Sequence, residues 1–318
     1  MEKLISGRCH LQLVPETYTL PPESRPGQTQ VPLCETIPVI DLEGELSFDR
    51  THLIKQIIQA SQEFGLFQLI NHGVSEKLVH DVIDVGKEFF ELPAKDKVSL
   101  YSEDPKQSCR LYTSIDYDSE KVHYWRDTLR HPCHPLEEHM QFWPEKPPHY
   151  REVVGNYSAE VWKLSLWVLD LICEGLELES RYLREELSPV QSMAINHYPP
   201  CPDPCLTLGL PKHSDVNLIT FLLQGESHVL QILKDGQWLA VEPLPNAFVV
   251  NVGHMIHIIS NGKLSSADHR VVTNKKVART TVTSFIHPCN NCRIEPAKVL
   301  SDCSPPLYRD FAYKDFLK

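Results

Sequence analysis

The 318-residue chain is 42% hydrophobic and 23% charged, which is ordinary for a soluble globular protein with one large or two modest domains. Its net charge of −11 argues against nucleic acid and anionic membrane as partners. The N-terminus lacks the layout of a signal peptide, and ten scattered cysteines fit reduced thiols. We therefore expect a cytoplasmic monomer that has no nucleic-acid or membrane partner.

Residues 1–36 are rich in proline and polar residues and show no sustained period, so we expect an extended arm with at most a short helix. Residues 37–42 are typical of a short edge strand, where proline is tolerated. Apolar residues at helical spacing then predict a helix that ends at Gly65 and a second that begins at the N-cap Ser75. A buried strand over residues 66–70 is expected between them.

Residues 99–143 show only weak patterns of turns and short strands. A long helix is predicted over 148–175, because apolar residues recur on one side of it, and a shorter helical piece over 181–187. From there on the pattern changes to strands and tight turns, including a hairpin with Asp235-Gly236 at its tip. Strands are predicted at 229–233, 238–241, 247–252 and 255–259. Many short strands without intervening helices indicate a sandwich or barrel, so the expected fold class is α+β.

The motif His213-Ser214-Asp215 holds an imidazole and a carboxylate two residues apart, so both leave the same face if the segment is a strand. An apolar run rich in β-branched residues follows it and supports that assignment. His269 opens a second strand-like segment, over 269–273. Two histidines and one carboxylate on neighbouring strands form the facial triad of non-haem Fe(II) oxygenases, which leaves three coordination positions open. An eight-stranded jelly roll is the architecture that places such ligands inside a closed pocket.

This interpretation has competitors, because a His-x-Asp pair is common and the chain contains 16 histidines. His254 and His257 are predicted on a strand near His269, so they compete for the ligand positions, although no carboxylate is paired with them. The C-x-x-C at 289–292 has only Cys303 nearby, which is too few ligands for a structural zinc site. These cysteines are therefore expected in a loop after the last core strand.

Arg279 strengthens the metal hypothesis. It shares one face of a predicted strand with Thr281, soon after His269, and so offers a guanidinium fork and a hydroxyl together. That combination suits one end of a dicarboxylate, which arginine can hold with two parallel hydrogen bonds. Asn196 and Tyr198 add an amide and a phenol on one face of an earlier strand end.

Together these motifs resemble the plant 2-oxoglutarate- and Fe(II)-dependent dioxygenases over nearly the whole chain. The Asn-x-Tyr-Pro-x-Cys-Pro motif at 196–202, the His-x-Asp motif, the late histidine and an Arg-x-Thr variant of Arg-x-Ser at 279–281 stand in the family's order. Residues 67–74 are similar to its N-terminal signature. Within the family the chain looks most like hyoscyamine 6β-hydroxylase-like members, and the segments that carry this likeness are 124–129, 143–148 and 172–176.

The resemblance implies a mainly helical N-terminal region packed around a double-stranded β-helix, or jelly-roll, core. It divides the chain into an extended arm at 1–36, an N-terminal dioxygenase region at 37–190, an Fe(II)/2-oxoglutarate jelly-roll domain at 191–290 and a C-terminal segment at 291–318. It also gives each candidate residue a role. The metal ligands are His213, Asp215 and His269; the 2-oxoglutarate contacts are Arg279, Thr281, Tyr198 and Asn196; the substrate contacts are Phe285, His287, Tyr112 and Leu111.

The implied reaction consumes 2-oxoglutarate and dioxygen, with ascorbate as the reductant in an assay, and releases succinate and carbon dioxide. The substrate is hydroxylated, desaturated or cyclised. Three departures from the family pattern bear on this. Thr281 replaces the usual serine, His254 stands where relatives commonly have aspartate, and the chain stops at Lys318, where relatives tend to continue with a segment that lids the pocket. The last departure predicts either a trimmed chain or an unusually open pocket mouth.

An aromatic-lined pocket favours a flat or bulky apolar substrate, so we expect a specialised metabolite such as an alkaloid, a phenolic or a terpenoid. Three other hypotheses about the function remain open. The chain is similar to an ascorbate-dependent oxidase of the ethylene-forming type; the same ligands suit a zinc-dependent hydrolase; and a jelly roll can serve as a non-catalytic binding protein.

Overall fold

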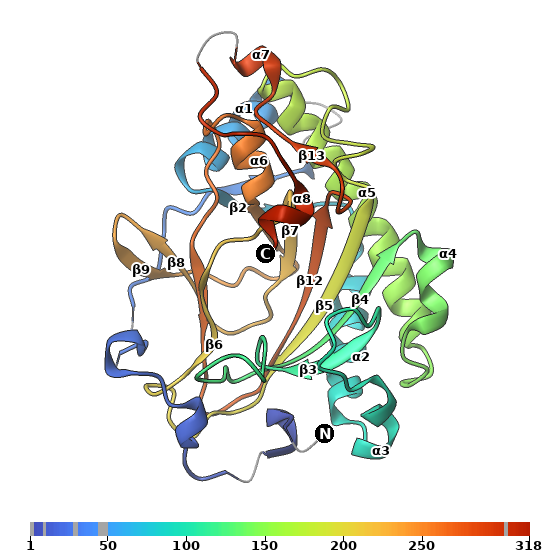
Figure 1. The fold of residues 1–318 in the computed structure, drawn as a ribbon, viewed down its shortest axis with the longest axis vertical. Helices are drawn as coiled ribbons and strands as arrows, with labels where there is room; N and C mark the ends of the chain where they lie inside the picture. The colour runs from blue at the N-terminus through green and yellow to red at the C-terminus, as the bar shows by residue number, and fades with distance from the viewer. Residues whose placement is uncertain (1–2, 9–10, 28–30, 44–49, 302–304) are drawn as a thin grey trace.

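The computed structural model describes residues 3–8, 11–27, 31–43, 50–301 and 305–318, and two facing β-sheets form its centre (Figure 1). Eight consecutive strands build this sandwich: β5 (Val190–Tyr198), β6 (Leu208–His213), β7 (Ile219–Leu223), β8 (Leu230–Lys234), β9 (Gln237–Ala240), β10 (Phe248–Val252), β11 (His269–Val272) and β12 (Arg279–His287). One sheet contains β10, β7, β12 and β5 in that order, and the other contains β6, β11, β8 and β9. Successive strands therefore alternate largely between the sheets, which confirms the predicted double-stranded β-helix.

Four earlier strands extend the larger sheet to eight strands: β1 (Val39–Asp41), β2 (Leu66–Ile70), β3 (Arg110–Thr113) and β4 (Asp127–His134). β1 lies at the edge, as predicted, and β2 pairs with β10. β4 pairs with β5 and carries β3 on its other side. The N-terminal half thus completes a sheet of the C-terminal half. The domain boundaries expected after residues 36, 190 and 290 stay predictions.

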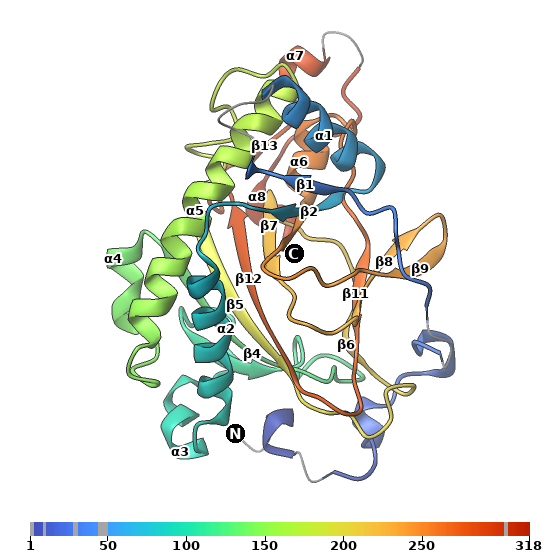
Figure 2. The same ribbon diagram turned by 180° about the vertical axis from the view of Figure 1, so that it is seen from behind.

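Helices cover the outer face of the larger sheet (Figure 2). The long ones are α1 (Arg50–Glu63), α2 (Glu76–Glu91) and α5 (Tyr150–Gly175). The side chain of Ser75 accepts a hydrogen bond from the backbone N–H of Leu78 at 3.3 Å, so it caps α2 as predicted. At Gly86 a β-carbon would lie 2.9 Å from the side chain of Ile195, so glycine lets α2 approach β5 closely. No helix in the described part of the chain has the length and apolar character to cross a membrane.

The shorter helices lie at the ends of the sandwich and between strands. They are α3 (Ala94–Lys97), α4 (Leu136–His139), α6 (His254–Ile259), α7 (Lys298–Ser301) and α8 (Tyr313–Phe316), and α8 follows the small hairpin of β13 (Arg293–Ile294) and β14 (Phe311–Ala312). The main apolar core fills the space between the long helices and the larger sheet, and it includes Ile57, Phe89, Val161 and Ile195. A second apolar cluster lies between the two sheets, where Tyr198 packs near Leu222.

The N-terminal arm lies along the body of the protein and forms short 3₁₀ turns, as at Ile5–Arg8. The buried carboxylate of Asp127 accepts hydrogen bonds from the backbone N–H groups of Ile5, at 3.0 Å, and Ser6, at 2.7 Å. Burial raises the pKa of Asp127, and these bonds partly offset that effect. The arm is therefore attached to the strand that borders β5.

Three local predictions were wrong. Residues 255–259 were expected as a strand but lie in α6, because a short apolar run fits a buried strand and a buried helix equally well. Residues 181–187 form turns instead of a helix, since Arg181 and Glu185 have φ angles of 67° and 56°, which no right-handed helix accommodates. Asp215 is not on a strand: β6 ends at His213, and Asp215 lies in the connection to β7.

Candidate active site

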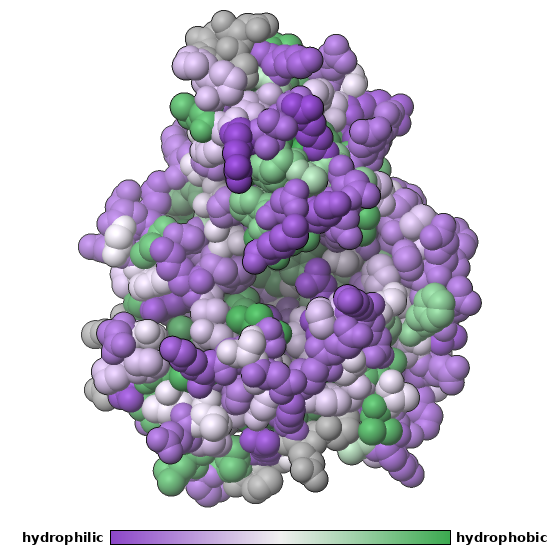
Figure 3. Space-filling model, viewed as in Figure 1, coloured by the Kyte–Doolittle hydropathy of each residue, from purple (hydrophilic) through white to green (hydrophobic). Residues whose placement is uncertain are grey.

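A cavity of about 710 Å³ lies between the two sheets and opens on the face shown in Figure 3, where a hollow is visible near the centre. Alternate residues of β12 line it, from Arg279 to His287, because successive side chains of a strand point to opposite faces. Tyr313 in α8 and Leu317 also line it, so the C-terminal residues form part of its wall. The two alternatives drawn from the chain's end, a trimmed chain or an unusually open pocket mouth, stay predictions.

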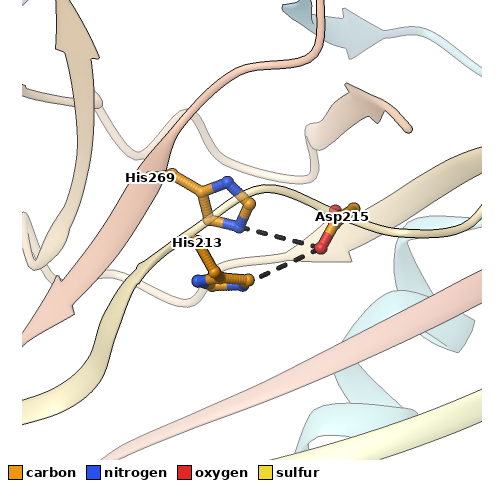
Figure 4. Close-up of side chains that lie close together, drawn as sticks. All are labelled: His213, Asp215 and His269. Carbon is orange, nitrogen blue, oxygen red and sulfur yellow. Dashed lines mark ion pairs between the residues drawn. The ribbon is translucent and has the colours of Figure 1, made fainter. Parts of the chain in front are cut away.

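His213, Asp215 and His269 meet at one point of the cavity wall (Figure 4). The register of β6 and β11 places His213 directly opposite His269. Their Nε2 atoms lie 3.8 Å and 3.9 Å from Oδ1 of Asp215. Bonds of about 2.1 Å let one ion bridge two atoms that are up to about 4 Å apart. Within the described ranges this is the one group of three or more such side chains close enough to share a metal ion.

Backbone carbonyls orient both imidazoles. Nδ1 of His213 lies 2.9 Å from the carbonyl oxygen of Pro211, and Nδ1 of His269 lies 3.0 Å from that of Ala267. A carbonyl only accepts, so each Nδ1 carries the proton and donates, which leaves a lone pair on each Nε2. Both lone pairs are therefore on the nitrogens that face Asp215. This is the arrangement in which neutral histidines bind a metal ion.

The protonation states of the cluster suit a cation. Burial and the neighbouring His269 lower the pKa of His213 to about 4, so its imidazole is neutral at pH 7. Burial alone would raise the pKa of Asp215, but the two histidines and hydrogen bonds from Thr220 and Asn251 outweigh it and lower the pKa. A neutral imidazole beside an ionised carboxylate is the form that binds metal.

The start of α6 holds the loop that carries Asp215. The backbone N–H of His254 donates to the carbonyl of Asp215 at 2.8 Å, and that of Gly253 donates to Leu218 at 2.7 Å. Nδ2 of Asn251, at the end of β10, donates to Oδ2 of Asp215 at 3.1 Å, which leaves Oδ1 directed at the histidines. A β-carbon on Gly253 would lie 1.9 Å from the carbonyl oxygen of Asn217, so only glycine fits this contact.

The competing ligand candidates, His254 and His257, make other contacts, and Nδ1 of His254 lies 3.3 Å from the backbone carbonyl oxygen of Asp215. Both lie in α6 instead of the expected strand, and neither belongs to the metal-binding group. Nδ1 of His257 contacts the carbonyl of Leu264, and its Nε2 lies 2.8 Å from the hydroxyl of Tyr308. The C-x-x-C at 289–292 also stays outside any such group of described residues, and Cys303 lies outside the described part of the chain.

Arg279 lies at the start of β12, buried in the cavity wall and paired in register with Tyr198. Its Nε donates to the carbonyl of Gln224 at 2.8 Å, and its guanidinium carbon lies 5.3 Å from the ring centre of Tyr198. Nη2 has no hydrogen-bond partner among the described residues, which is costly for a buried cation. Burial lowers the pKa of Arg279 to about 10, so the group stays positive at pH 7. A buried cation with a free donor fits an anion.

Thr281 and Asn196 continue the wall beside Arg279. They are opposite each other in the pairing of β12 with β5, and Asn196 Nδ2 lies 3.5 Å from Thr281 Oγ1. The Asn196 carbonyl accepts a hydrogen bond from Thr128 at 2.9 Å and from Arg126 at 3.4 Å, so its amide is fixed in orientation. The four residues expected to contact 2-oxoglutarate therefore all line the same cavity.

Three of the four expected substrate contacts line the cavity, namely Phe285, His287 and Tyr112, whereas Leu111 does not. Leu111 is fully buried in the main core, because its neighbour Tyr112 takes the cavity-facing position on β3. We therefore withdraw Leu111 as a predicted substrate contact.

Several lining residues were missed, including Arg126, Arg130, Thr283 and Asn251. One signal was available for Asn251, which is the polar residue inside the apolar run of β10. Arg130 lies on β4 and Arg126 directly precedes that strand. That Arg130 faces the cavity becomes visible only once β4 is paired with β5.

Comparison with known proteins agrees with this geometry. Residues 189–288 match the 2OG-Fe(II) oxygenase superfamily, and residues 37–149 match the N-terminal region described as "non-haem dioxygenase in morphine synthesis". The chain is 44% identical over 315 residues to hyoscyamine 6-dioxygenase of Hyoscyamus niger, covering 95% of this chain and 90% of that protein. It is 42% identical over 319 residues to flavanone 3-dioxygenase 2 of Oryza sativa subsp. japonica, covering 99% and 92%.

A solved structure, JOX2 in complex with 2OG, Fe and JA, has a TM-score of 0.88 and 30% identity to the chain, and the match covers 99% of this chain and 92% of that one. The families, the relatives and the fold agree with the donor set of two imidazoles and one carboxylate beside a buried guanidinium. The chain therefore belongs to the 2OG-Fe(II) oxygenase superfamily and is a dioxygenase that uses Fe(II) and 2-oxoglutarate.

Proposed function

We propose that the enzyme oxidises a small specialised metabolite, such as an alkaloid, a phenolic or a terpenoid, at the metal centre of this cavity. The observation that carries the proposal is the meeting of three groups in one cavity: the cluster of His213, Asp215 and His269, the unpaired donor of Arg279, and an apolar wall that includes Phe285. Hydroxylation, desaturation and ring closure are the possible outcomes for the substrate.

In this proposal His213, Asp215 and His269 hold the iron. When bound, the iron supplies oxidative decarboxylation of 2-oxoglutarate, to succinate and carbon dioxide, coupled to oxidation of the substrate. The protein orients the reactants and excludes water. The carbonyls of Pro211 and Ala267 keep both Nε2 lone pairs directed at one point, so the ligands need little reorganisation on loading.

Arg279 is proposed to bind the far carboxylate of 2-oxoglutarate. Its Nη2 gains the partner that it lacks, and a charge-assisted hydrogen bond is about twice as strong as a neutral one. Thr281 adds a hydroxyl on the same strand face, and Tyr198 and Asn196 complete the wall from β5. Because Thr281 differs from serine only by a methyl group, it keeps the donor that the family pattern requires.

The test is succinate release by protein supplied with Fe(II), 2-oxoglutarate and ascorbate, with and without a panel of alkaloids, flavonoids, coumarins and terpenoids. We expect a true substrate to stimulate succinate formation and to gain an oxygen atom or lose two hydrogens, which mass spectrometry detects. Absence of succinate under every condition would favour the oxidase of the ethylene-forming type. Activity restored by Zn²⁺ instead of Fe(II) would favour a hydrolase.

The proposal includes a cytoplasmic monomer. Every cysteine among the described residues is free, and several of them are buried, which suits a reducing compartment. Cell fractionation and sedimentation of the purified protein test the two parts separately.

A further inference from the structure

The charged side chains that line the cavity are mostly cationic. Three are arginines, Arg126, Arg130 and Arg279, whereas Asp215 is the one carboxylate among the described lining residues. Asp215 faces the two histidines, and Arg279 is assigned to 2-oxoglutarate above. Among the described residues, no acidic side chain lies within ion-pair distance of Arg126 or Arg130. The cavity therefore holds positive charge that the protein does not neutralise.

The two remaining arginines differ in how they are held. Arg126 is buried, its Nε donates to the carbonyl of Ser114 at 3.1 Å, and its Nη1 donates to Asn196 at 3.4 Å. Arg130 is exposed on the cavity side, and its Nη2 makes one long hydrogen bond, of 3.4 Å, to the hydroxyl of Ser192. The phenol of Tyr112 is also hydrogen-bonded to Arg130. A guanidinium has five N–H donors, so Arg130 keeps donors for a ligand beyond its contacts with Ser192 and Tyr112.

The surroundings of Arg130 favour an anion. Burial would raise the pKa of the Tyr112 phenol, but the guanidinium charges of Arg126, Arg130 and Arg110 outweigh it and lower the pKa. The guanidinium carbon of Arg110 lies 4.0 Å from the ring centre of Tyr112, although Arg110 is outside the cavity lining. The arginines at this end of the cavity therefore favour a negatively charged group over a neutral one.

Arg130 is well separated from Arg279. Arg130 on β4 pairs with Ala194 on β5, and Ala194 pairs with Thr283 on β12. Arg279 lies on β12 four residues before Thr283. At about 3.4 Å per residue, this places their backbone positions about 14 Å apart along the sheet, so the two arginines come from different parts of the cavity wall. The small side chain of Ala194 leaves the floor open beside Arg130, and the Phe285 ring centre lies 5.5 Å from the guanidinium carbon.

We propose that Arg130 is a specificity-determining residue that binds the carboxylate of the substrate, so that the substrate class is a small organic acid with an aromatic or otherwise apolar skeleton. The skeleton lies against Phe285 between Arg130 and the metal centre. Among the described lining residues the one carboxylate is Asp215, which belongs to the metal cluster, so a basic alkaloid finds no free carboxylate among them. The inference rests on the function proposed above and narrows its substrate class. In this proposal the enzyme discriminates between substrates by their charge.

The test is a binding measurement that needs no turnover. Protein loaded with Mn²⁺ in place of iron and with 2-oxoglutarate is titrated calorimetrically with benzoate, cinnamate and naphthalene-2-carboxylate, each compared with its methyl ester and its matched primary amine. We expect at least one acid to bind about tenfold or more tightly than its ester, since a hydrogen bond to a charged group commonly contributes that much, and the amines to bind weakest.

Arg130→Gln should bring the acid and ester affinities to within about twofold of each other, whereas Arg130→Lys, which keeps the charge, should retain part of the preference. Arg181→Gln is the matched control, because Arg181 is exposed and lies outside the cavity. The proposal is overturned if no acid in the panel binds, if an ester or amine binds as well as its acid, or if Arg130→Gln keeps the preference.

Binding of Mn²⁺ and 2-oxoglutarate is measured first, in the wild type and in Arg130→Gln. Failure of the wild type to bind either one would refute the proposed function itself, independently of Arg130. Loss of 2-oxoglutarate binding in Arg130→Gln alone would show that Arg130 serves the co-substrate, and would also overturn the inference.

Discussion

Replacing Gly253 by alanine should displace the metal centre without changing any of its ligands. A β-carbon at this position would lie 1.9 Å from the carbonyl oxygen of Asn217, 2.6 Å from its carbonyl carbon and 2.8 Å from the carbonyl oxygen of Leu218. All three are backbone atoms, so no side-chain rotation can relieve the overlap. The connection between β6 and β7 must move by about 1 Å or more to reach ordinary contact distances.

That movement reaches Asp215, whose carbonyl is hydrogen-bonded to the N–H of His254 next to the substitution. Overpacking of this kind costs about 1–3 kcal/mol of unfolding free energy. Metal sites tolerate a displacement of only about 0.5 Å, and loss of a supporting contact lowers metal affinity by about 10- to 100-fold. We therefore expect Gly253→Ala to lose both stability and affinity for Fe(II) or Mn²⁺.

Urea unfolding and metal titration of the purified variant measure the two effects. Gly7→Ala is the control, because a β-carbon there meets nothing within 4 Å. If Gly253→Ala unfolds at the wild-type urea concentration and binds the metal with wild-type affinity, then α6 does not hold the Asp215 loop in the way described.

Arg279→Gln should raise the KM for 2-oxoglutarate by about 10- to 100-fold, because hydrogen bonds to charged groups contribute about 1.5–3 kcal/mol. The affinity for the metal ion should stay unchanged. An unaltered KM in initial-rate kinetics would contradict the role assigned to Arg279. Asp215→Ala should abolish metal binding and turnover, whereas His254→Ala should leave metal binding largely intact; metal analysis that gives the reverse result would move the ligand assignment to α6. The free energy of unfolding should decrease as the pH falls from about 6.5 to about 4, because burial lowers the pKa of His131 to about 4 and the unfolded chain takes up a proton that the folded chain excludes. Urea titrations at pH 7 and pH 5 should show this loss reduced by about 2 kcal/mol in His131→Gln, and an equal loss in both proteins would exclude His131 as its source.

Sequence patterns were sufficient for features that depend on one segment at a time. The N-cap Ser75, the turn at Asp235-Gly236 and the strand that begins at His269 follow from local residue chemistry, and the structure has all three. The residue pattern suggested that His213 and His269 share a metal ion, and the resemblance to a family supported it. The register that places them opposite each other could not be derived from either segment alone, because pairing between β6 and β11 is a long-range property.

The wrong predictions share a physical cause. Tertiary contacts decide which way a side chain faces and which strands pair. The run 255–259 is apolar throughout, so it has no period that separates helix from strand. Leu111 and Tyr112 are adjacent, and only the pairing of β3 with β4 decides which of them faces the cavity. Arg130 was missed for the same reason, because the partner strand of β4 follows the 26-residue helix α5.

The cross-strand placement of His213 and His269 also makes the bound ion a reporter of correct refolding. A slip of one residue between β6 and β11 would turn one imidazole away from the cavity, since neighbouring side chains on a strand point in opposite directions. A mispaired chain would then retain at most two of the three donors and release its metal to a chelator far more readily. Chelator resistance can therefore serve to separate correctly registered molecules from compact but misaligned ones in a refolded preparation.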